Sequence, residues 1–238
     1  MSSLDSKRAA GFAAADRFVT SNMKVGMGTG STAVWAIRRI GERLAASDIT
    51  GIVGVATSSQ SELECQKLGI PLRSMNDPEI RGHLDLTIDG ADEIDPQLRL
   101  VKGGGGALLI EKIVAYASDK MVVVADPGKL VENLGLAFAI PLEVLPLARV
   151  PVMATLLKMG GSAKVRMAER KMGAVITDNG NIIVDYLLDA PVDPVELEAR
   201  LGAIPGVLGN GIFSGITPEV IIGESDGSVR EVQPRGFS

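Results

Sequence analysis

The sequence predicts an α/β protein with a doubly wound, mostly parallel sheet and a smaller inserted α+β domain. Two observations carry this prediction. Short apolar runs alternate with helical patterns up to about residue 125, and from about residue 133 strand patterns follow one another instead. Alternation of strands and helices is typical of parallel sheets, whereas grouped strands with a helix on one face are typical of α+β domains.

The first half begins with a predicted helix over residues 4–18, which is rich in alanine. A strand over 24–27 then leads through a glycine-rich turn into a second helix, because Val34, Ile37 and Ile40 recur at the spacing of one buried face. The remaining elements of this half alternate between strand and helix: 52–56, 59–68, 84–88, 107–117 and 121–125.

In the second half, residues 136–145 and 163–169 are predicted as strands. Asp178-Asn179-Gly180 predicts a hairpin between 174–177 and 182–186. A helix is predicted over 193–201, with Asp193 as its N-cap and Pro194 in its first position. We therefore assign residues 133–206 to the small domain, and 1–132 together with 207–238 to the main domain. The tail, which has a second turn at Asp226-Gly227, is expected to return to the main sheet.

The rarest residues limit the chemistry. The chain has one cysteine, Cys65, and one histidine, His83, so neither a structural zinc site nor a disulfide can form within it. We expect no metal and no catalytic part for either residue. Glycine, by contrast, supplies 28 of the 238 residues. Chemistry is therefore expected from carboxylates, lysines, hydroxyls and backbone N–H groups.

Charge and hydropathy exclude two partner classes. The net charge is −5 and no run of Lys and Arg is long enough to bind a polyanion, so nucleic acid is not an expected partner. The longest uncharged stretch, Leu201 to Pro218, is broken by glycines and prolines and predicts no membrane span. The N-terminal residues lack the apolar core of a signal peptide, so a cytoplasmic location is expected.

The first chemical motif is Gly28-Thr29-Gly30-Ser31-Thr32, between a strand and a helix. Glycines let successive N–H groups converge, and a helix N-terminus and three hydroxyls add further donors, which together favour a phosphate. The dinucleotide fingerprint and the Walker pattern do not match, so a sugar phosphate or mononucleotide is favoured over NAD or ATP. A plain strand-to-helix turn with a Ser/Thr cap explains the segment equally well.

The second motif places five acids within eleven residues, and the apolar strand over 84–88 ends directly at the second of them: Asp85, Asp89, Asp92, Glu93 and Asp95. Ligands bind at the carboxyl ends of strands in open α/β sheets. Asp89 and Asp92 are the candidates for binding a hydroxylated ligand, since only the small residues Gly90 and Ala91 separate them. Glu93 and Asp95 are expected to cap a helix or to face solvent.

The third motif is Lys102 followed by four glycines, Gly103 to Gly106, and then by a helix that carries Glu111. A flexible linker is the common role of such a run. Apolar residues crowd both sides here, however, which favours N–H groups pressed against a ligand with Lys102 as a cation beside it. Glu111 and Lys112 alone would be explained as a solvated helix face.

Together the three motifs resemble type A ribose-5-phosphate isomerases in order and spacing, nearly from end to end. Further matches are Ala125-Asp126 with Lys129, Thr177-Asp178-Asn179-Gly180-Asn181 and Ile204-Pro205-Gly206-Val207. The resemblance implies interconversion of ribose 5-phosphate and ribulose 5-phosphate without a metal or redox cofactor. It also implies a Rossmann-like main domain, a ferredoxin-like small domain and a homo-oligomer, usually a dimer or tetramer.

The resemblance also implies roles for single residues. Glu111 would be the general base, and Lys102 with the amides of Gly103, Gly104 and Gly105 would stabilise an enediolate. Asp89 and Asp92 would also be catalytic: Asp89 would help to open the ring or relay protons between oxygens, and Asp92 would position hydroxyls. The other residues would bind substrate, with Lys129 and Lys7 as cations at the phosphate: Thr29, Gly30, Ser31, Thr32, Gly90 and Ala91.

Two positions depart from the family pattern. Leu109-Ile110 stands where Thr-Arg is frequent, and Gly128 stands where Ser is common before the phosphate lysine. Both departures concern local packing and phosphate contacts more than the chemistry.

Other classes stay open. A sugar-phosphate-sensing regulator domain can share the Gly-Thr-Gly-Ser-Thr turn, but it would need a basic DNA-binding helix. Amino-sugar-phosphate deaminases and acyl-CoA transferases have a similar turn, and the glycine run after Lys102 together with Glu111 argues against both. Release of ammonia or dependence on CoA would discriminate them.

Overall fold

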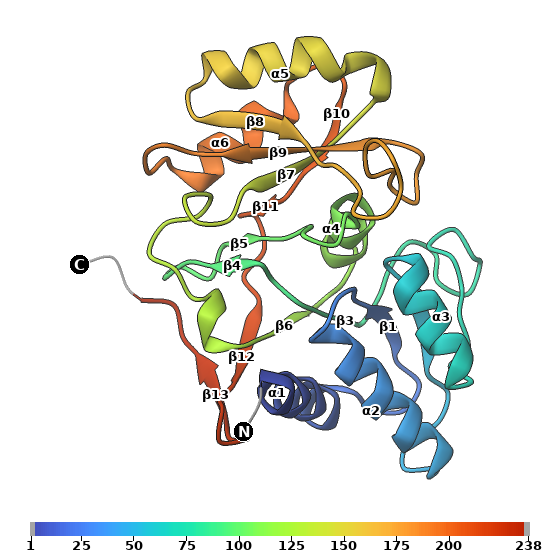
Figure 1. The fold of residues 1–238 in the computed structure, drawn as a ribbon. Helices are drawn as coiled ribbons and strands as arrows, with labels where there is room; N and C mark the ends of the chain where they lie inside the picture. The colour runs from blue at the N-terminus through green and yellow to red at the C-terminus, as the bar shows by residue number, and fades with distance from the viewer. Residues whose placement is uncertain (1–2, 236–238) are drawn as a thin grey trace. The chain divides into compact units, whose positions relative to one another are not determined.

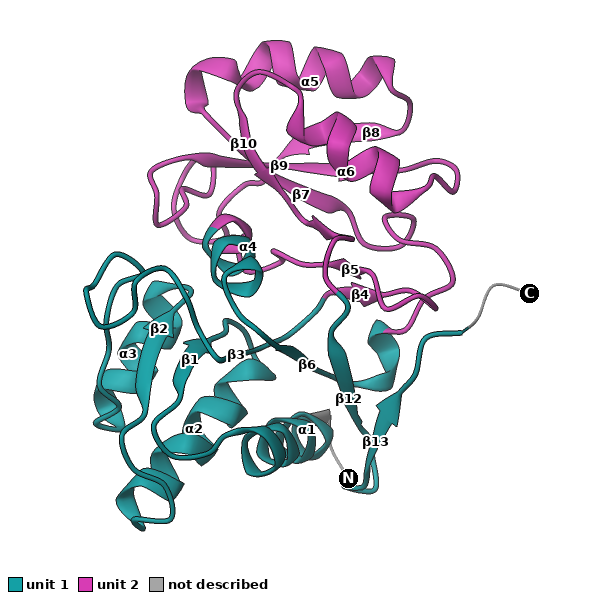
Figure 2. Ribbon diagram, turned by 180° about the vertical axis from the view of Figure 1, so that it is seen from behind, with its two compact units in different colours: residues 1–91, 110–129, 217–238 teal, residues 92–109, 130–216 magenta. Residues whose placement is uncertain are grey.

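The computed structural model describes residues 3–235 as two compact units (Figure 2). Unit 1 contains the residues up to 91, residues 110–129 and the residues from 217 onward, and unit 2 contains 92–109 and 130–216. Each unit has its own sheet and its own buried core.

Unit 1 is built on a six-stranded sheet (Figure 1). The strands are β1 (Lys24–Met27), β2 (Val53–Ala56), β3 (Leu86–Asp89), β6 (Met121–Ala125), β12 (Glu219–Gly223) and β13 (Val229–Val232). Their order is β13-β12-β6-β3-β1-β2, and all pairs are parallel except β12 with β13. Numbered by their order along the chain, the five parallel strands lie in the order 2-1-3-4-5. The strand order therefore reverses between β1 and β3, although these two strands are parallel.

Helices cover both faces of this sheet, which confirms the doubly wound prediction. Helices α1 (Ser3–Phe18) and α2 (Ala33–Ala45) pack over Val25 and Met27 of β1, with α3 (Ser59–Lys67) beside α2. Helix α4 (Leu108–Tyr116) covers the opposite face, where Val114 lies against β1 at Gly26. A Cβ at Gly26 would lie 2.5 Å from Val114 Cγ1, so the close approach of α4 depends on this glycine.

Unit 2 contains a ferredoxin-like βαββαβ arrangement. Its elements are β7 (Ile140–Val144), α5 (Arg149–Lys158), β8 (Ser162–Val165), β9 (Ile182–Leu187), α6 (Pro194–Gly202) and β10 (Val207–Asn210). The antiparallel strand order is β10-β7-β9-β8, and both helices pack on one face of the sheet through residues such as Val152, Leu156, Leu197 and Leu201.

A three-stranded sheet completes unit 2: β4 (Glu93–Ile94), β5 (Leu100–Val101) and β11 (Ile212–Phe213) in the order β11-β5-β4. β10 pairs with β7, and β4 and β11 pair with β5, so residues 92–109, 130–132 and 207–216 belong to unit 2, whereas the sequence analysis assigned them to the main domain. The strands β4, β5 and β11 have two residues each, which is too short for a periodic signal.

Most predicted elements are present, and the errors are local. Asp193 caps α6 through the N–H groups of Val195 and Glu196, as expected. Residues 174–177 form only isolated bridges, so the predicted hairpin has one regular strand, β9. Helix α5 was missed, because Pro151 in its sequence reads as a breaker although proline is tolerated in a first turn. The tail joins the main sheet from β12 onward and turns at Gly227, where φ is +87°.

The part of the chain that the structure describes has no helix long and apolar enough to cross a membrane. Two short 3₁₀ turns, Pro127–Lys129 and Pro146–Ala148, follow β6 and β7.

We predict that Gly26→Ala lowers the free energy of unfolding by about 1–3 kcal/mol, the usual cost of overpacking a filled core. The added methyl group would meet Thr87 and Val114. Urea unfolding followed by circular dichroism measures the change. Gly202→Ala is the matched control, since its nearest neighbour would be Asn210 Nδ2 at 3.9 Å. Equal midpoints for the two variants would refute the packing argument.

Candidate active site

The reversal between β1 and β3 brings two of the predicted motifs together at the carboxyl edge of the sheet in unit 1. β1 ends at Met27, directly before the loop 28–32, and β3 ends at Asp89. Such a reversal is where ligands bind in doubly wound sheets. The sequence showed both strand ends, and the strand order makes them neighbours.

The Asp89 carboxylate organises this edge. Its Oδ1 accepts hydrogen bonds from the N–H groups of Thr29, at 3.0 Å, and Gly90, at 2.7 Å. Gly28 N–H donates to the Ile88 carbonyl at 3.0 Å, and a Cβ at Gly28 would lie 2.4 Å from Asp89 Oδ1. Asp89 is fully buried. The loop can therefore approach β3 only with glycine at position 28.

Several donors of the loop 28–32 bond to other parts of the protein and are not available to a ligand. Thr29 Oγ1 bonds with Thr57 Oγ1 at 2.7 Å and with Ser58 Oγ at 2.6 Å, and Gly30 N–H donates to Gln60 Oε1 at 2.9 Å. These partners follow β2, and sequence reasoning missed them. The signal was available, because Thr57-Ser58-Ser59 is a second hydroxyl-rich junction of strand and helix.

Within the described residues, 3–235, the N–H groups of Ser31 and Thr32 have no hydrogen-bond acceptor, unlike those of residues 28–30. Thr32 is the N-cap of α2 and its side chain makes no capping bond. A helix N-terminus with such donors attracts anions. The backbone donors of the loop that remain for an anion are thus those of its last residues rather than of the whole run.

Two predicted cations lie at the same edge of unit 1. Lys7 Nζ donates to Ser31 Oγ at 2.9 Å. Lys129 ends the 3₁₀ turn after β6, the strand next to β3, and its N–H bonds to the Asp126 carbonyl. A cavity joins Lys7 to this turn; its lining comprises Ser6, Lys7, Asp126, Pro127, Glu224 and Ser225. Lysines at the sheet edge that also carries the N-terminus of α2 and the exposed Ser31 suit a phosphate dianion.

Glu111 lies in the first turn of α4 and is 3% exposed. It stands three residues before Val114, so both side chains lie on the helix face that meets the sheet. The alternative of a solvated helix face is therefore wrong for Glu111. A buried carboxylate at the carboxyl edge of a sheet is suited to proton transfer.

Unit 2 holds the rest of the third motif. Lys102 is 2% exposed; its N–H donates to the Gly211 carbonyl at 2.8 Å, and its ammonium lies 5.6 Å from the centre of the Phe213 ring. Gly104 N–H donates to Asp92 Oδ2 at 2.7 Å. Asp92 thus binds the glycine run, and Phe213 is a partner of Lys102 for which no sequence motif gave a signal.

The other acids of the second motif have structural partners. Glu93, 2% exposed, accepts the N–H groups of Gly135 and Phe138. Asp95, 3% exposed, pairs with Arg99 at 2.6 Å. The expectation that these two acids cap a helix or face solvent is wrong, because the chain folds back over both of them. Backbone donors and Arg99 offset the cost of their burial.

The departures from the family pattern are accommodated by packing. Leu109 lies against Gly209, and Ile110 packs beside the buried cluster that includes Val114. Gly128 donates its N–H to Asp126 Oδ1 at 3.0 Å.

His83 lies at the amino end of β3, at the opposite edge of the sheet from the loop. Its Nε2 is 3.2 Å from Asp119 Oδ2. With Asp85 these residues form the one group in the described chain whose His, Cys, Asp or Glu side chains could hold a metal ion. Cys65 is fully buried in α3, and burial raises the pKa of its thiol to about 12.

A hydroxyl-bearing loop before a helix at the reversal of strand order in a doubly wound sheet, and a buried lysine before a glycine run with a buried glutamate in the helix after it, define a class of α/β protein that handles small phosphorylated molecules. The sequence model of ribose 5-phosphate isomerase A (phosphoriboisomerase A) matches residues 53–227. The chain belongs to this family.

Individual relatives agree with this assignment. The chain is 46% identical over 218 residues to ribose-5-phosphate isomerase A of Synechocystis sp., which covers 92% of this chain and 91% of the relative. The relative from Treponema denticola is 46% identical over 216 residues, 90% of each chain. The solved ribose 5-phosphate isomerase from Plasmodium falciparum has a TM-score of 0.90 at 37% identity and full coverage of both chains. A D-ribose-5-phosphate isomerase solved in complex with phospho-erythronic acid has a TM-score of 0.90 at 38% identity, covering 95% of this chain and 97% of that one.

We predict that the Cys65 thiol of the folded protein reacts with iodoacetamide at pH 8 at least about a hundredfold more slowly than in denaturant, because it is buried and almost wholly protonated. Mass spectrometry measures the labelling, and a parallel assay follows ketose formation from ribose 5-phosphate. Rapid labelling, or labelling that abolishes ketose formation in proportion, would contradict the placement of Cys65.

Proposed function

We propose that this chain interconverts D-ribose 5-phosphate and D-ribulose 5-phosphate. The observation that carries the proposal is the near full-length match to enzymes of this name, together with Glu111 buried in the helix after the glycine run. The complex of a relative with phospho-erythronic acid supports a phosphorylated sugar derivative as the ligand. The regulator, deaminase and CoA-transferase alternatives gain no support from the relatives.

The reaction moves a proton between adjacent carbons, and different residues of this chain transfer the proton, stabilise the charge and position the substrate. Glu111 takes the proton from C2 of the open-chain aldose, which leaves an enediolate, and returns it to C1, while a proton passes from the oxygen at C2 to that at C1. Lys102 and the amides of Gly103 and Gly105 stabilise the negative oxygen, as positioned donors do for developing charge. The Gly104 amide, expected in the same role, is bonded to Asp92 instead. Asp89 assists ring opening or relays the proton between oxygens, and Asp92 positions hydroxyls.

Binding rests on unit 1. Ser31 and Thr32 present N–H groups ahead of α2, and Lys7 already contacts Ser31, so we place the phosphate there with Lys129 as a second cation. Thr29 and Gly30 shape the loop through their bonds to Asp89 and Gln60. Gly90 and Ala91 leave room beside the sugar.

The direct test incubates purified, chelator-treated protein with ribose 5-phosphate and follows ketose formation. Conversion to equilibrium is the expected result, and no conversion at any protein concentration would overturn the proposal. We further propose a homo-oligomer in the cytoplasm, as the resemblance implies; light scattering after size-exclusion chromatography tests the first part.

We predict that Glu111→Gln folds and binds sugar phosphate but loses about 10²–10⁴-fold in kcat, the usual contribution of a positioned general base. The amide keeps the shape of the side chain and cannot accept the proton. Steady-state kinetics measure the loss, with Glu62→Gln, an exposed glutamate of α3, as the control. Turnover close to that of the native protein would remove Glu111 from the mechanism.

We predict that Lys129→Ala raises KM by about tenfold or more with a small change in kcat, because a uniform binding contact is lost. Lys67→Ala is the control, since its side chain is 72% exposed on α3. A reduced kcat with unchanged KM would show that Lys129 acts in the chemical step instead.

A further inference from the structure

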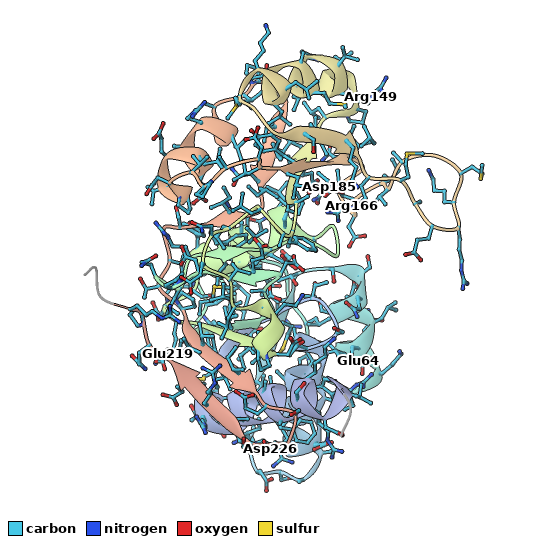
Figure 3. All side chains as sticks on the ribbon, turned by 60° about the vertical axis from the view of Figure 1, so that its left-hand side comes forward. Glu64, Arg149, Arg166, Asp185, Glu219 and Asp226 are labelled. Atoms are coloured by element: carbon cyan, nitrogen blue, oxygen red, sulfur yellow. The ribbon has the colours of Figure 1, made fainter. Side chains whose placement is uncertain are left out.

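The glycine run of unit 2 is held by a side chain that no sequence motif indicated. Arg166, which follows β8, donates through Nη1 to the carbonyls of Gly103, at 3.1 Å, and Gly104, at 2.8 Å. Its Nε donates to Asp185 Oδ2 at 3.0 Å, and its Nη2 donates to Asp185 Oδ1. Figure 3 shows Arg166 and Asp185 next to each other. One guanidinium thus joins β9 to the glycine run.

Arg166 and Asp185 are held by burial and by backbone hydrogen bonds. The side chains of Arg166 and Asp185 are 17% and 11% exposed. The backbone of Arg166 is fixed as well, since its N–H bonds to the Ile183 carbonyl and its carbonyl accepts the N–H of Val175. Four of the five N–H donors of the Arg166 guanidinium bond to protein groups, and two of these bonds go to the glycine run, so its contacts connect it to the loop.

The run needs such support. Consecutive glycines lose more conformational freedom on ordering than any other residues, and Gly103 and Gly106 take positive φ values of +101° and +79°. Arg166 holds the carbonyl side of the Gly103 and Gly104 peptides, while Asp92 Oδ2 holds the Gly104 N–H from the other side. The position of the segment directly after Lys102 therefore depends on two opposite charges.

The contact also has an electronic consequence. A cation on a peptide oxygen polarises the whole peptide group and strengthens its N–H as a donor. The carbonyl of Gly104 shares its peptide group with the N–H of Gly105, one of the amides that the proposed function directs at the enediolate. The guanidinium therefore improves the donor as well as placing it.

We propose that Arg166, held by Asp185, is a positioning residue for the isomerisation: it fixes the Gly103–Gly104 segment so that the adjacent amides and Lys102 meet the enediolate. This inference rests on the proposed function. Lysine cannot replace arginine here, because its single ammonium group cannot bind a carboxylate bidentately and two carbonyls at once.

The test uses Arg166→Met, Arg166→Ala and Asp185→Asn in the full chain. For ribose 5-phosphate, we expect kcat to fall by about tenfold or more while KM changes by less than about threefold, because the proposed phosphate site belongs to unit 1. Added guanidinium at millimolar concentration should restore part of the kcat of Arg166→Ala. Arg200→Ala, which breaks an exposed pair with Glu196 in the same unit, is the control and should keep kcat and show no response to guanidinium.

Amide hydrogen exchange gives a readout that does not depend on activity. The amides of residues 104–106 should exchange faster in the Arg166 variants than in Arg200→Ala. Unchanged exchange, a kcat within about twofold of the native value, or a rise in KM alone would each overturn the positioning role. If the native protein does not convert ribose 5-phosphate, the proposed function fails, and the exchange data still decide whether Arg166 orders the run. If Arg166→Met does not fold, Asp185→Asn supplies both measurements.

Discussion

The hydrogen bonds that Asp89 Oδ1 accepts from Thr29 and Gly90 join the ends of β1 and β3, and the candidate site of unit 1 depends on them. They bring the loop before α2 against β3, and they require glycine at position 28 because a methyl group would collide with the carboxylate. The same bonds set which donors of the loop remain for a ligand. Because the first N–H groups of the loop bond to protein groups, the N–H groups of Ser31 and Thr32 remain, and Lys7 contacts the exposed Ser31.

Buried charge is the second constraint on this protein. Asp89, Lys102, Glu111 and Glu143 are each at most 3% exposed, and burial of charged groups is costly unless polar partners surround them. Glu143 illustrates a structural solution, because its Oε1 accepts hydrogen bonds from Thr177, Asn179 and Asn181 and so fixes the turn before β9. Asp185 on β9 then holds Arg166, which reaches the glycine run. The antiparallel sheet of unit 2 thus supports the glycine run through Asp185 and Arg166.

Sequence reasoning succeeded where one segment carries the whole signal. The alternation of strands and helices, the Asp193-Pro194 helix start and the three glycine and acid motifs were readable because their patterns are local. It failed where a signal was too short or depended on distant residues. Strands of two residues have no period, and the burial of Glu93 and Asp95 results from the segment near residue 135 and from Arg99.

The fold class, the family and the set of candidate residues were readable from the order of amino acids, since backbone propensities, turn chemistry and motif order are properties of the chain. The hydrogen-bond partners of those residues became known only from the folded arrangement. It assigned the Thr29 and Gly30 amides to Asp89 and Gln60, the Gly104 amide to Asp92, and its carbonyl to Arg166. These partners lie between 12 and 62 residues away along the chain. Hydrogen bonds between groups so distant in sequence depend on strand order and packing, which no local pattern encodes.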